Sequence, residues 1–272
     1  MLETATDYRI PETLRGTILE SIMHSKVHEL IGAKKKLPAV SMESVLDRAP
    51  EIRSFQRALK AHSPAIIAEI KRASPSAGQI RQDFDPVKIA REYQESGAAA
   101  LSVITEVQHF HGGLEILASA RWNCSLPLLR KDFIIDPYQI LEARRAGADA
   151  VLLIAALLDA TLLKNLRVEA ERHGMGALVE VHNELELERT LESGATLIGV
   201  NNRDLRTFEV SLDVALNLAG KLPGHVIAVA ESGIRSAEDV RRLSNAGYHG
   251  FLVGEHLMRA PSPGKALKEL IR

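Results

Sequence analysis

Four similar stretches recur along this chain roughly every 50 residues: SGAAALSV (residues 96–103), AGADAVLL (residues 146–153), SGATLIGV (residues 193–200) and AGYHGFLV (residues 246–253). In each, a glycine follows an amphipathic segment and precedes a short apolar run. Glycine supplies the left-handed conformation that commonly ends a helix, so each stretch is expected to join a helix to a strand. Because another apolar run lies between successive repeats, the unit is two strand–helix modules, and four units predict eight strands.

The predicted strands are short runs that are apolar almost throughout. They cover residues 65–69, 100–104, 127–130, 150–154, 177–181, 197–200, 226–230 and 250–253. Continuous apolar runs are typical of a parallel sheet that is covered on both faces. Helices are expected between them, for example over residues 137–146 and 236–246, the second with Ser236 as its N-cap. Eight such modules within roughly 210 residues favour a closed (β/α)₈ barrel over an open doubly wound sheet.

Residues 1–60 have a different character, rich in Lys, Arg and Glu with apolar residues at helical spacing. We expect two or three helices packed against one end of the barrel, with residues 33–38 (AKKKLP) as a solvated loop between them. The chain is thus predicted to be one α/β domain over residues 1–272. Within it, residues 1–60 form an N-terminal helical extension and residues 61–272 the barrel.

Composition excludes several classes of protein. The chain has 34 Lys and Arg against 35 Asp and Glu, so no excess of positive charge indicates binding to nucleic acid or to an anionic membrane. The single cysteine, Cys124, cannot form an internal disulfide. The N-terminus lacks the apolar segment of a secretion signal, so a cytoplasmic location is expected. Histidine pairs such as His109 and His111 lack a third ligand at useful spacing, and no metal is predicted.

Barrel enzymes place their active sites at the carboxyl ends of the strands. Glu69 and Lys71 end the first run and lie two residues apart, so both side chains point to the same side. They form either a structural ion pair or part of a site. We favour the site, because Ser74 and Pro75 follow in an irregular loop that could close over a ligand.

Lys131 and Glu180 end the third and fifth runs. Partial desolvation is expected to weaken the preference of Lys131 for its charged form, which would suit a general acid. Glu180 should feel opposing effects of burial and of a nearby lysine, which suits a general base or an anion that stabilises a cation. The alternative is purely structural pairing, of Lys131 with Asp132 or Glu180.

A phosphate site is expected at the last two strands. Ser232 and Gly233 follow the seventh run, Gly254 follows the eighth, and each segment leads toward a helix. Backbone N–H groups at such loops and helix N-termini bind phosphate in many α/β barrels, and glycine permits the close approach.

With these residues in view, the chain resembles the indole-3-glycerol-phosphate synthases. AIIAEIKRASPSAG (residues 65–78) looks like a signature of that family. The likeness extends along almost the whole chain through LSVITE, LLRKDFI, GADAVLLI, ALVEVH, GVNNRDL, AVAESGI and FLVGEHLM. It implies conversion of 1-(2-carboxyphenylamino)-1-deoxyribulose 5-phosphate to indole-3-glycerol phosphate, CO₂ and water, with no metal or organic cofactor.

The resemblance also implies roles for individual residues. Lys131 corresponds to the general acid of ring closure, and Glu180 to the carboxylate that acts as base and stabilises the charged intermediate. Lys71 should hold the substrate carboxylate and serve as an acid in dehydration. The remaining implied members are Glu69 and Glu231, which tune the lysines; Asn201, which orients the reacting groups; Arg203, which faces the substrate carboxylate or the catalytic network; Phe110, Phe133 and Leu205 as apolar walls; and Ser74, Ser232, Gly233 and Gly254 at the phosphate. Some relatives have serine in place of Glu255, so we leave Glu255 out of the binding set.

Two other functions stay open at this point. A barrel like phosphoribosylanthranilate isomerase would share the phosphate loops, but it uses an Asp or Cys acid–base pair where this chain has Glu69, Lys71 and Lys131. A barrel retained only to bind a phosphorylated ligand would be expected to have a damaged set of strand-end residues. We expect a small phosphorylated substrate, no nucleic-acid or membrane partner, and a monomer or weak homo-oligomer.

Overall fold

The computed structural model describes residues 8–272. Eight parallel strands close into a barrel in the order β1-β10-β9-β8-β7-β6-β5-β4, so the predicted fold class is confirmed. The barrel strands are β1 (Ala65–Ile70), β4 (Ala100–Ile104), β5 (Leu128–Lys131), β6 (Ala150–Ile154), β7 (Gly176–Val181), β8 (Leu197–Asn201), β9 (Ile227–Glu231) and β10 (Gly250–Val253).

Four strands end one residue later than expected. β1 ends at Ile70, β5 at Lys131, β8 at Asn201 and β9 at Glu231. In the ladder, Asn201 is paired with Glu231, and Ile104 with Lys131. Three of the candidate polar residues are therefore the last residues of buried strands: Lys131, Asn201 and Glu231. They are held by the backbone hydrogen bonds of the barrel and do not belong to the loops beyond.

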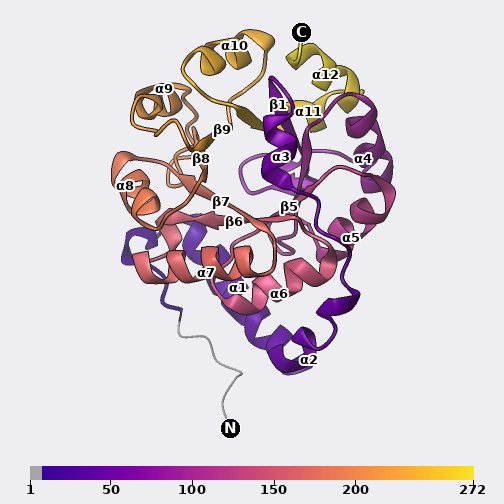
Figure 1. Ribbon diagram of the computed structural model, residues 1–272, viewed down its shortest axis with the longest axis vertical. Coiled ribbons are helices and arrows are strands. Elements are labelled where there is room, and N and C mark those ends of the chain that lie inside the picture. Colours follow the sequence, from indigo (N-terminus) through magenta and orange to yellow (C-terminus); the bar gives the residue numbers. More distant parts are fainter. Residues whose placement is uncertain (1–7) are drawn as a thin grey trace.

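Helices surround the strands as a ring (Figure 1). They are α4 (Pro86–Glu95), α5 (Leu114–Asn123), α6 (Pro137–Ala146), α7 (Ala160–Arg172), α8 (Glu184–Glu192), α9 (Asp213–Ala219), α10 (Ala237–Asn245), α11 (Glu255–Arg259) and α12 (Pro263–Leu270), with a short 3₁₀ turn η3 (Ala155–Leu157). The ring closes where α12 lies beside α4: Glu92 Oε1 accepts hydrogen bonds from Ser262 Oγ (2.7 Å) and Gly264 N (2.9 Å).

The helix boundaries follow from short-range chemistry. Ser236 and Asp239 form a reciprocal capping box at the start of α10. Asp136 caps α6, whose first residue is Pro137. The glycine of every repeat adopts the predicted left-handed conformation, with φ of 91° at Gly97, 90° at Gly147, 84° at Gly194 and 106° at Gly247.

The loop after β1 contains an element that the sequence did not indicate. β2 (Ala73–Ser74) and β3 (Gly78–Gln79) form a small antiparallel pair in which Ser74 faces Gly78. Gly78 has φ of 62°, which suits the tight reversal between them. This hairpin holds Ser74 and Pro75 over the barrel mouth.

The N-terminal extension differs from the expected arrangement. It consists of η1 (Glu12–Leu14), α1 (Ile18–Lys36), α2 (Ala39–Glu43), η2 (Leu46–Arg48) and α3 (Phe55–Lys60). α1 lies at the mouth, whereas α3 covers the opposite end, where Gln56 Nε2 bonds Thr196 Oγ1 just before β8. The prediction that all these helices pack at one end is wrong, because α1 lines the mouth, α2 packs against α6 and α3 lies at the opposite end.

The predicted solvated loop at residues 33–38 is also wrong for its first four residues. Residues 33–36 form the last turn of α1, and Lys34 Nζ pairs with Asp136 Oδ2 at 2.8 Å. Lysine is a good helix former and its charge favours a helix C-terminus, so a lysine run can end a helix as readily as it can leave one.

Within residues 8–272, no helix is both long enough and apolar enough to cross a bilayer.

Candidate active site

A cavity of about 550 Å³ opens at the carboxyl ends of the strands. Every site residue predicted from the sequence lines it. From the first half of the barrel these are Glu69, Lys71, Ser74, Pro75, Phe110, Lys131 and Phe133; from the second half, Glu180, Asn201, Arg203, Leu205, Glu231, Ser232, Gly233 and Gly254. The cavity combines a charged floor with an apolar wall.

Lys131 lies at the centre of the charged floor. Its Nζ is 2.9 Å from Glu180 Oε2 and 3.4 Å from Glu231 Oε2. Asp132, the other partner considered from the sequence, also lines the cavity but forms its ion pairs with Lys26 and Arg130. Asn201 Nδ2 donates to Glu180 Oε1 at 3.0 Å, so Glu180 is held from both of its oxygens.

The expectation that Lys131 loses its preference for the charged form is wrong. Burial alone would lower the pKa of Lys131, but the charges of Glu180, Glu231 and Glu69 outweigh it, and the pKa lies above its ordinary value. Burial alone would likewise raise the pKa of Glu180, but Lys131 and His182 hold it well below the usual range. Both groups are therefore charged at neutral pH.

Glu231 behaves in the opposite way. Burial, together with the nearby charge of Glu180, outweighs the attraction of Lys131 and raises the pKa of Glu231 to about 8. Within residues 8–272, neither carboxylate oxygen of Glu231 makes a hydrogen bond. A Cβ at Gly199 would collide with Glu231 Oε1, so glycine there makes room for this carboxyl group.

Glu69 and Lys71 point to the same side, as their spacing predicted, and form the ion pair that was considered as the alternative to a site, with Lys71 Nζ 2.6 Å from Glu69 Oε1; both also line the cavity. Gly254 contributes to this pair, because a Cβ there would collide with Glu69 Oε1. The glycine predicted as a phosphate contact therefore also makes space for a carboxylate.

The loops after β9 and β10 have the open backbone expected of an anion site. Ser232 and Gly233 both have positive φ, 64° and 81°, and Gly254 precedes the first turn of α11. Arg203 reaches this end of the cavity, where its guanidinium donates to Phe208 O at 3.1 Å and lies 3.6 Å from Glu255. The two roles expected for Arg203, to face the substrate carboxylate or the catalytic network, stay predictions.

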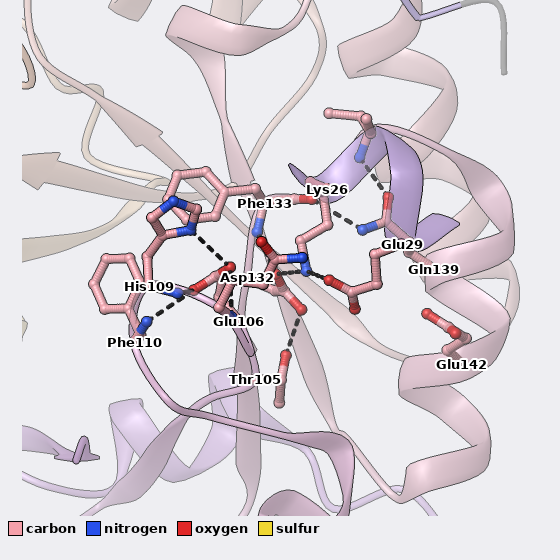
Figure 2. A network of polar contacts seen from close by, with 12 residues as sticks. Lys26, Glu29, Thr105, Glu106, His109, Phe110, Asp132, Phe133, Gln139 and Glu142 are labelled. Atoms are coloured by element: carbon pink, nitrogen blue, oxygen red, sulfur yellow. Dashed lines mark hydrogen bonds and ion pairs between the residues drawn. The ribbon is translucent and has the colours of Figure 1, made fainter. Parts of the chain in front are cut away.

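The apolar wall is built around two aromatic rings, Phe110 and Phe133, whose centroids are 6.1 Å apart at 46°. Leu205 completes the predicted wall. Buried Glu106 fixes the loop that carries Phe110: it accepts hydrogen bonds from the backbone N–H groups of Gln108, His109 and Phe110 (Figure 2).

Behind this wall lies a buried charge network centred on Asp132 (Figure 2). Lys26, from α1, is 1% exposed and places its Nζ 2.9 Å from Asp132 Oδ1. Thr105 Oγ1 and an Arg130 guanidinium nitrogen donate to the other oxygen, at 2.6 and 3.0 Å. Asp132 adjoins Lys131 and Phe133 in the chain, so this network ties α1 to the strand end that carries both.

Several cavity residues were not found from the sequence. Leu19 and Ile22 come from α1, and Glu106, Phe208, His256 and Arg259 come from the loops and α11. Only the residues from α1 have a signal in the sequence. It is the helical spacing of Ile18 and Ile22, which predicts a buried helix face but not which surface covers that face. Within the described residues, no group of three or more His, Cys, Asp or Glu side chains is placed to hold a metal ion.

Comparison with known proteins agrees with this geometry. Residues 19–270 match the family model described as "Indole-3-glycerol phosphate synthase". Proteins of that name from Albidiferax ferrireducens and Polaromonas naphthalenivorans are 50% and 51% identical to this chain, each over 93% of it and over 97% and 98% of their own length. A relative from Carboxydothermus hydrogenoformans is 49% identical, over 93% of this chain and 99% of its own.

Solved structures share the fold at low identity. A 3-hexulose-6-phosphate synthase superposes with a TM-score of 0.61 at 16% identity, covering 76% of this chain and 97% of its own. A thiamine phosphate pyrophosphorylase from Pyrococcus furiosus gives 0.57 at 18% identity, covering 76% and 93%. These likenesses show the barrel alone.

Proposed function

The chain belongs to the indole-3-glycerol phosphate synthase family, and on that premise we propose which residues at the barrel mouth carry the reaction. The enzyme closes the indole ring of 1-(2-carboxyphenylamino)-1-deoxyribulose 5-phosphate and releases CO₂ and water. The observation that carries the assignment is the position of Lys131, between two buried carboxylates at the floor of the cavity.

Ring closure requires attack of the carboxylate-bearing aromatic carbon on the substrate ketone. Protonation of the ketone oxygen by Lys131 makes the ketone carbon electrophilic. Lys131 is fully protonated at rest, and the substrate ketone would take a place beside Nζ within the charged cluster. The aromatic ring fits against Phe110, Phe133 and Leu205. The charge of Glu180 stabilises the cationic intermediate until loss of CO₂ restores the aromatic ring.

Dehydration requires an acid for the departing hydroxyl and a base for the ring proton. Lys71, held by Glu69, supplies the acid and before that binds the substrate carboxylate. Glu180 is the proposed base. Glu231 tunes Lys131, and its pKa of about 8 also allows it to take up and return a proton near neutral pH. Asn201 orients Glu180 through its hydrogen bond.

The phosphate is proposed to lie at the other end of the cavity, against the backbone of Ser232, Gly233 and Gly254 and under the Ser74–Pro75 hairpin. Arg203 and Arg259 add positive charge there. Anchoring the phosphate restricts the flexible sugar chain, and such positioning can contribute several kcal/mol to a reaction. The strand-end lysines and carboxylates support this assignment over an isomerase or a binder without catalysis.

The direct test is to add the substrate to purified enzyme and follow indole fluorescence. The Lys131→Ala variant should lose at least about 10²-fold in kcat, as expected for removal of a general acid. Lys131→Arg keeps the charge between the two glutamates but cannot release a proton, so it should be equally inactive. Lys88→Ala, at an exposed position of α4, is the matched control. Wild-type activity in Lys131→Arg would overturn the assignment of the acid.

We further propose that residues 1–60 and the barrel fold as one domain, which the burial of Lys26 against Asp132 supports. A monomer or weak homo-oligomer in the cytoplasm is proposed, since a phosphorylated biosynthetic intermediate is made and used inside the cell. Sedimentation of the purified enzyme at micromolar concentration tests the oligomeric state.

A further inference from the structure

One mostly buried histidine has no part in the roles assigned above. His182 directly follows β7, two residues beyond Glu180, and its side chain is 11% exposed. It is absent from the lining of the cavity, so substrate does not reach it there. It nevertheless contacts Glu180, which lines the cavity.

Both ring nitrogens of His182 face carboxylates. Nε2 is 3.2 Å from Glu180 Oε1, in an ion-pair contact that is not aligned as a hydrogen bond. Nδ1 is 3.1 Å from Glu186 Oε2. A neutral imidazole carries a proton on only one nitrogen and would turn a lone pair toward the other carboxylate, so this geometry fits the doubly protonated ring.

The charged groups that face His182 are acidic. Glu186, in the first turn of α8, is fixed by the backbone N–H of His182 (2.8 Å) and by Asn183 Nδ2 (2.7 Å). Asp204, in the loop after β8, adds a longer-range attraction. Beyond Glu180 lies Lys131. The charges therefore alternate along the line Lys131, Glu180, His182, Glu186.

The two carboxylates beside Lys131, Glu180 and Glu231, differ in how many positive charges they contact. Lys131 contacts both Glu180 and Glu231, and one ammonium group balances only one of two buried carboxylates. His182 contacts Glu180 and makes no ion pair with Glu231 within residues 8–272. A second positive charge is thus placed beside one carboxylate only.

We propose that His182 is a positioning residue whose imidazolium keeps Glu180 ionised and leaves the proton of the carboxylate pair on Glu231. The proposal rests on the proposed role of Glu180. The titration behaviour of the ring agrees with it: burial alone would lower the pKa of His182, but Glu180 and Glu186 outweigh burial and raise it to about 10.

The test is the pH profile of His182→Gln, which keeps a polar side chain but removes the charge. The acid limb of kcat should move up by at least about one pH unit, because Glu180 loses a neighbouring cation. At pH values below the midpoint of the wild-type limb this predicts a loss of up to about tenfold in kcat, which is regained about two or more pH units above that midpoint. KM should change by less than about threefold, since His182 does not line the cavity. His173→Gln, which breaks the His173–Glu169 contact outside the site (3.0 Å), is the matched control and should leave the profile unchanged.

An unshifted profile, or an equal loss of kcat at every pH, would overturn the proposal, since the second result is that of a merely structural residue. If His182→Gln does not fold, the wild-type enzyme decides: NMR of histidine-labelled protein should show the His182 ring doubly protonated at pH 7, and a neutral ring would overturn the proposal. If wild-type enzyme makes no indole product, the proposed function fails, and the ring's protonation state still tests the inference.

Discussion

The Lys26–Asp132 pair offers a sharp test of how the N-terminal extension is bound to the barrel. The change is Lys26→Met, which keeps most of the apolar stem and removes the charge. Lys26 Nζ lies 2.9 Å from Asp132 Oδ1 and 2.8 Å from Glu29 Oε2, and Asp132 is fully buried. The substitution leaves a buried carboxylate without one of its two cations.

The magnitude follows from what Asp132 retains. Loss of one partner of a buried ion pair costs about 3–5 kcal/mol. Arg130, Thr105 and the Phe133 N–H still donate to Asp132, so the cost should lie near the lower limit, about 3 kcal/mol. For a chain of this size that corresponds to a fall in Tm of roughly 6–12 °C.

The assay is thermal unfolding followed by near-UV circular dichroism at pH 7. Lys35→Met is the control, because Lys35 is exposed on the same helix and should change Tm by less than about 2 °C. Adding Asp132→Asn to Lys26→Met should cost less than the sum of the two single changes, since the remaining buried charge is removed. A Tm for Lys26→Met equal to that of Lys35→Met would refute the reasoning that this pair holds α1 in place.

Two further predictions concern the floor of the cavity. In the wild-type protein, Glu231 should lower the free energy of unfolding by up to about 1.4 kcal/mol per pH unit between pH 4.5 and about 8. The reason is that the folded protein holds a proton on Glu231 that the unfolded chain releases near pH 4.5. In Glu231→Gln this contribution is removed, so the free energy of unfolding should fall less steeply over the same range. Urea unfolding at four pH values measures this, and identical slopes would contradict the raised pKa. In Gly254→Ala, the new Cβ would collide with Glu69 Oε1, so Glu69 must leave Lys71 and kcat should fall at least about tenfold. Gly224→Ala, where a Cβ meets nothing within 4 Å, is the control, and equal kcat in the two variants would show that Gly254 makes no such room.

Much of the fold was predictable because its signals are short-range. An apolar run, a capping residue and a glycine with positive φ each act within a few residues. The repeat at residues 146–153, for example, contains both the glycine that ends a helix and the apolar run of the next strand. The N-terminal extension was placed less well, since apolar spacing shows that a helix is buried on one face but not which surface covers it. The short pair formed by β2 and β3 has too few residues to give a pattern.

The members of the candidate site were also predictable, for a topological reason. In a parallel barrel every strand ends at the same mouth, so polar residues that end apolar strands must converge even when they lie far apart in the chain. Glu69, Lys131 and Glu231 meet for this reason alone. The sequence by itself thus determined the barrel and the charged residues at the floor of its mouth.

Only the tertiary structure decided the charge states. Whether a buried lysine gains or loses its proton depends on how many carboxylates lie within a few ångströms of it, because Coulomb attraction and desolvation both act through space. Lys131 faces Glu180 and Glu231 and stays charged, against the expectation from its burial. Glu180 also has His182 beside it and Glu231 does not, a difference that no spacing along the chain encodes.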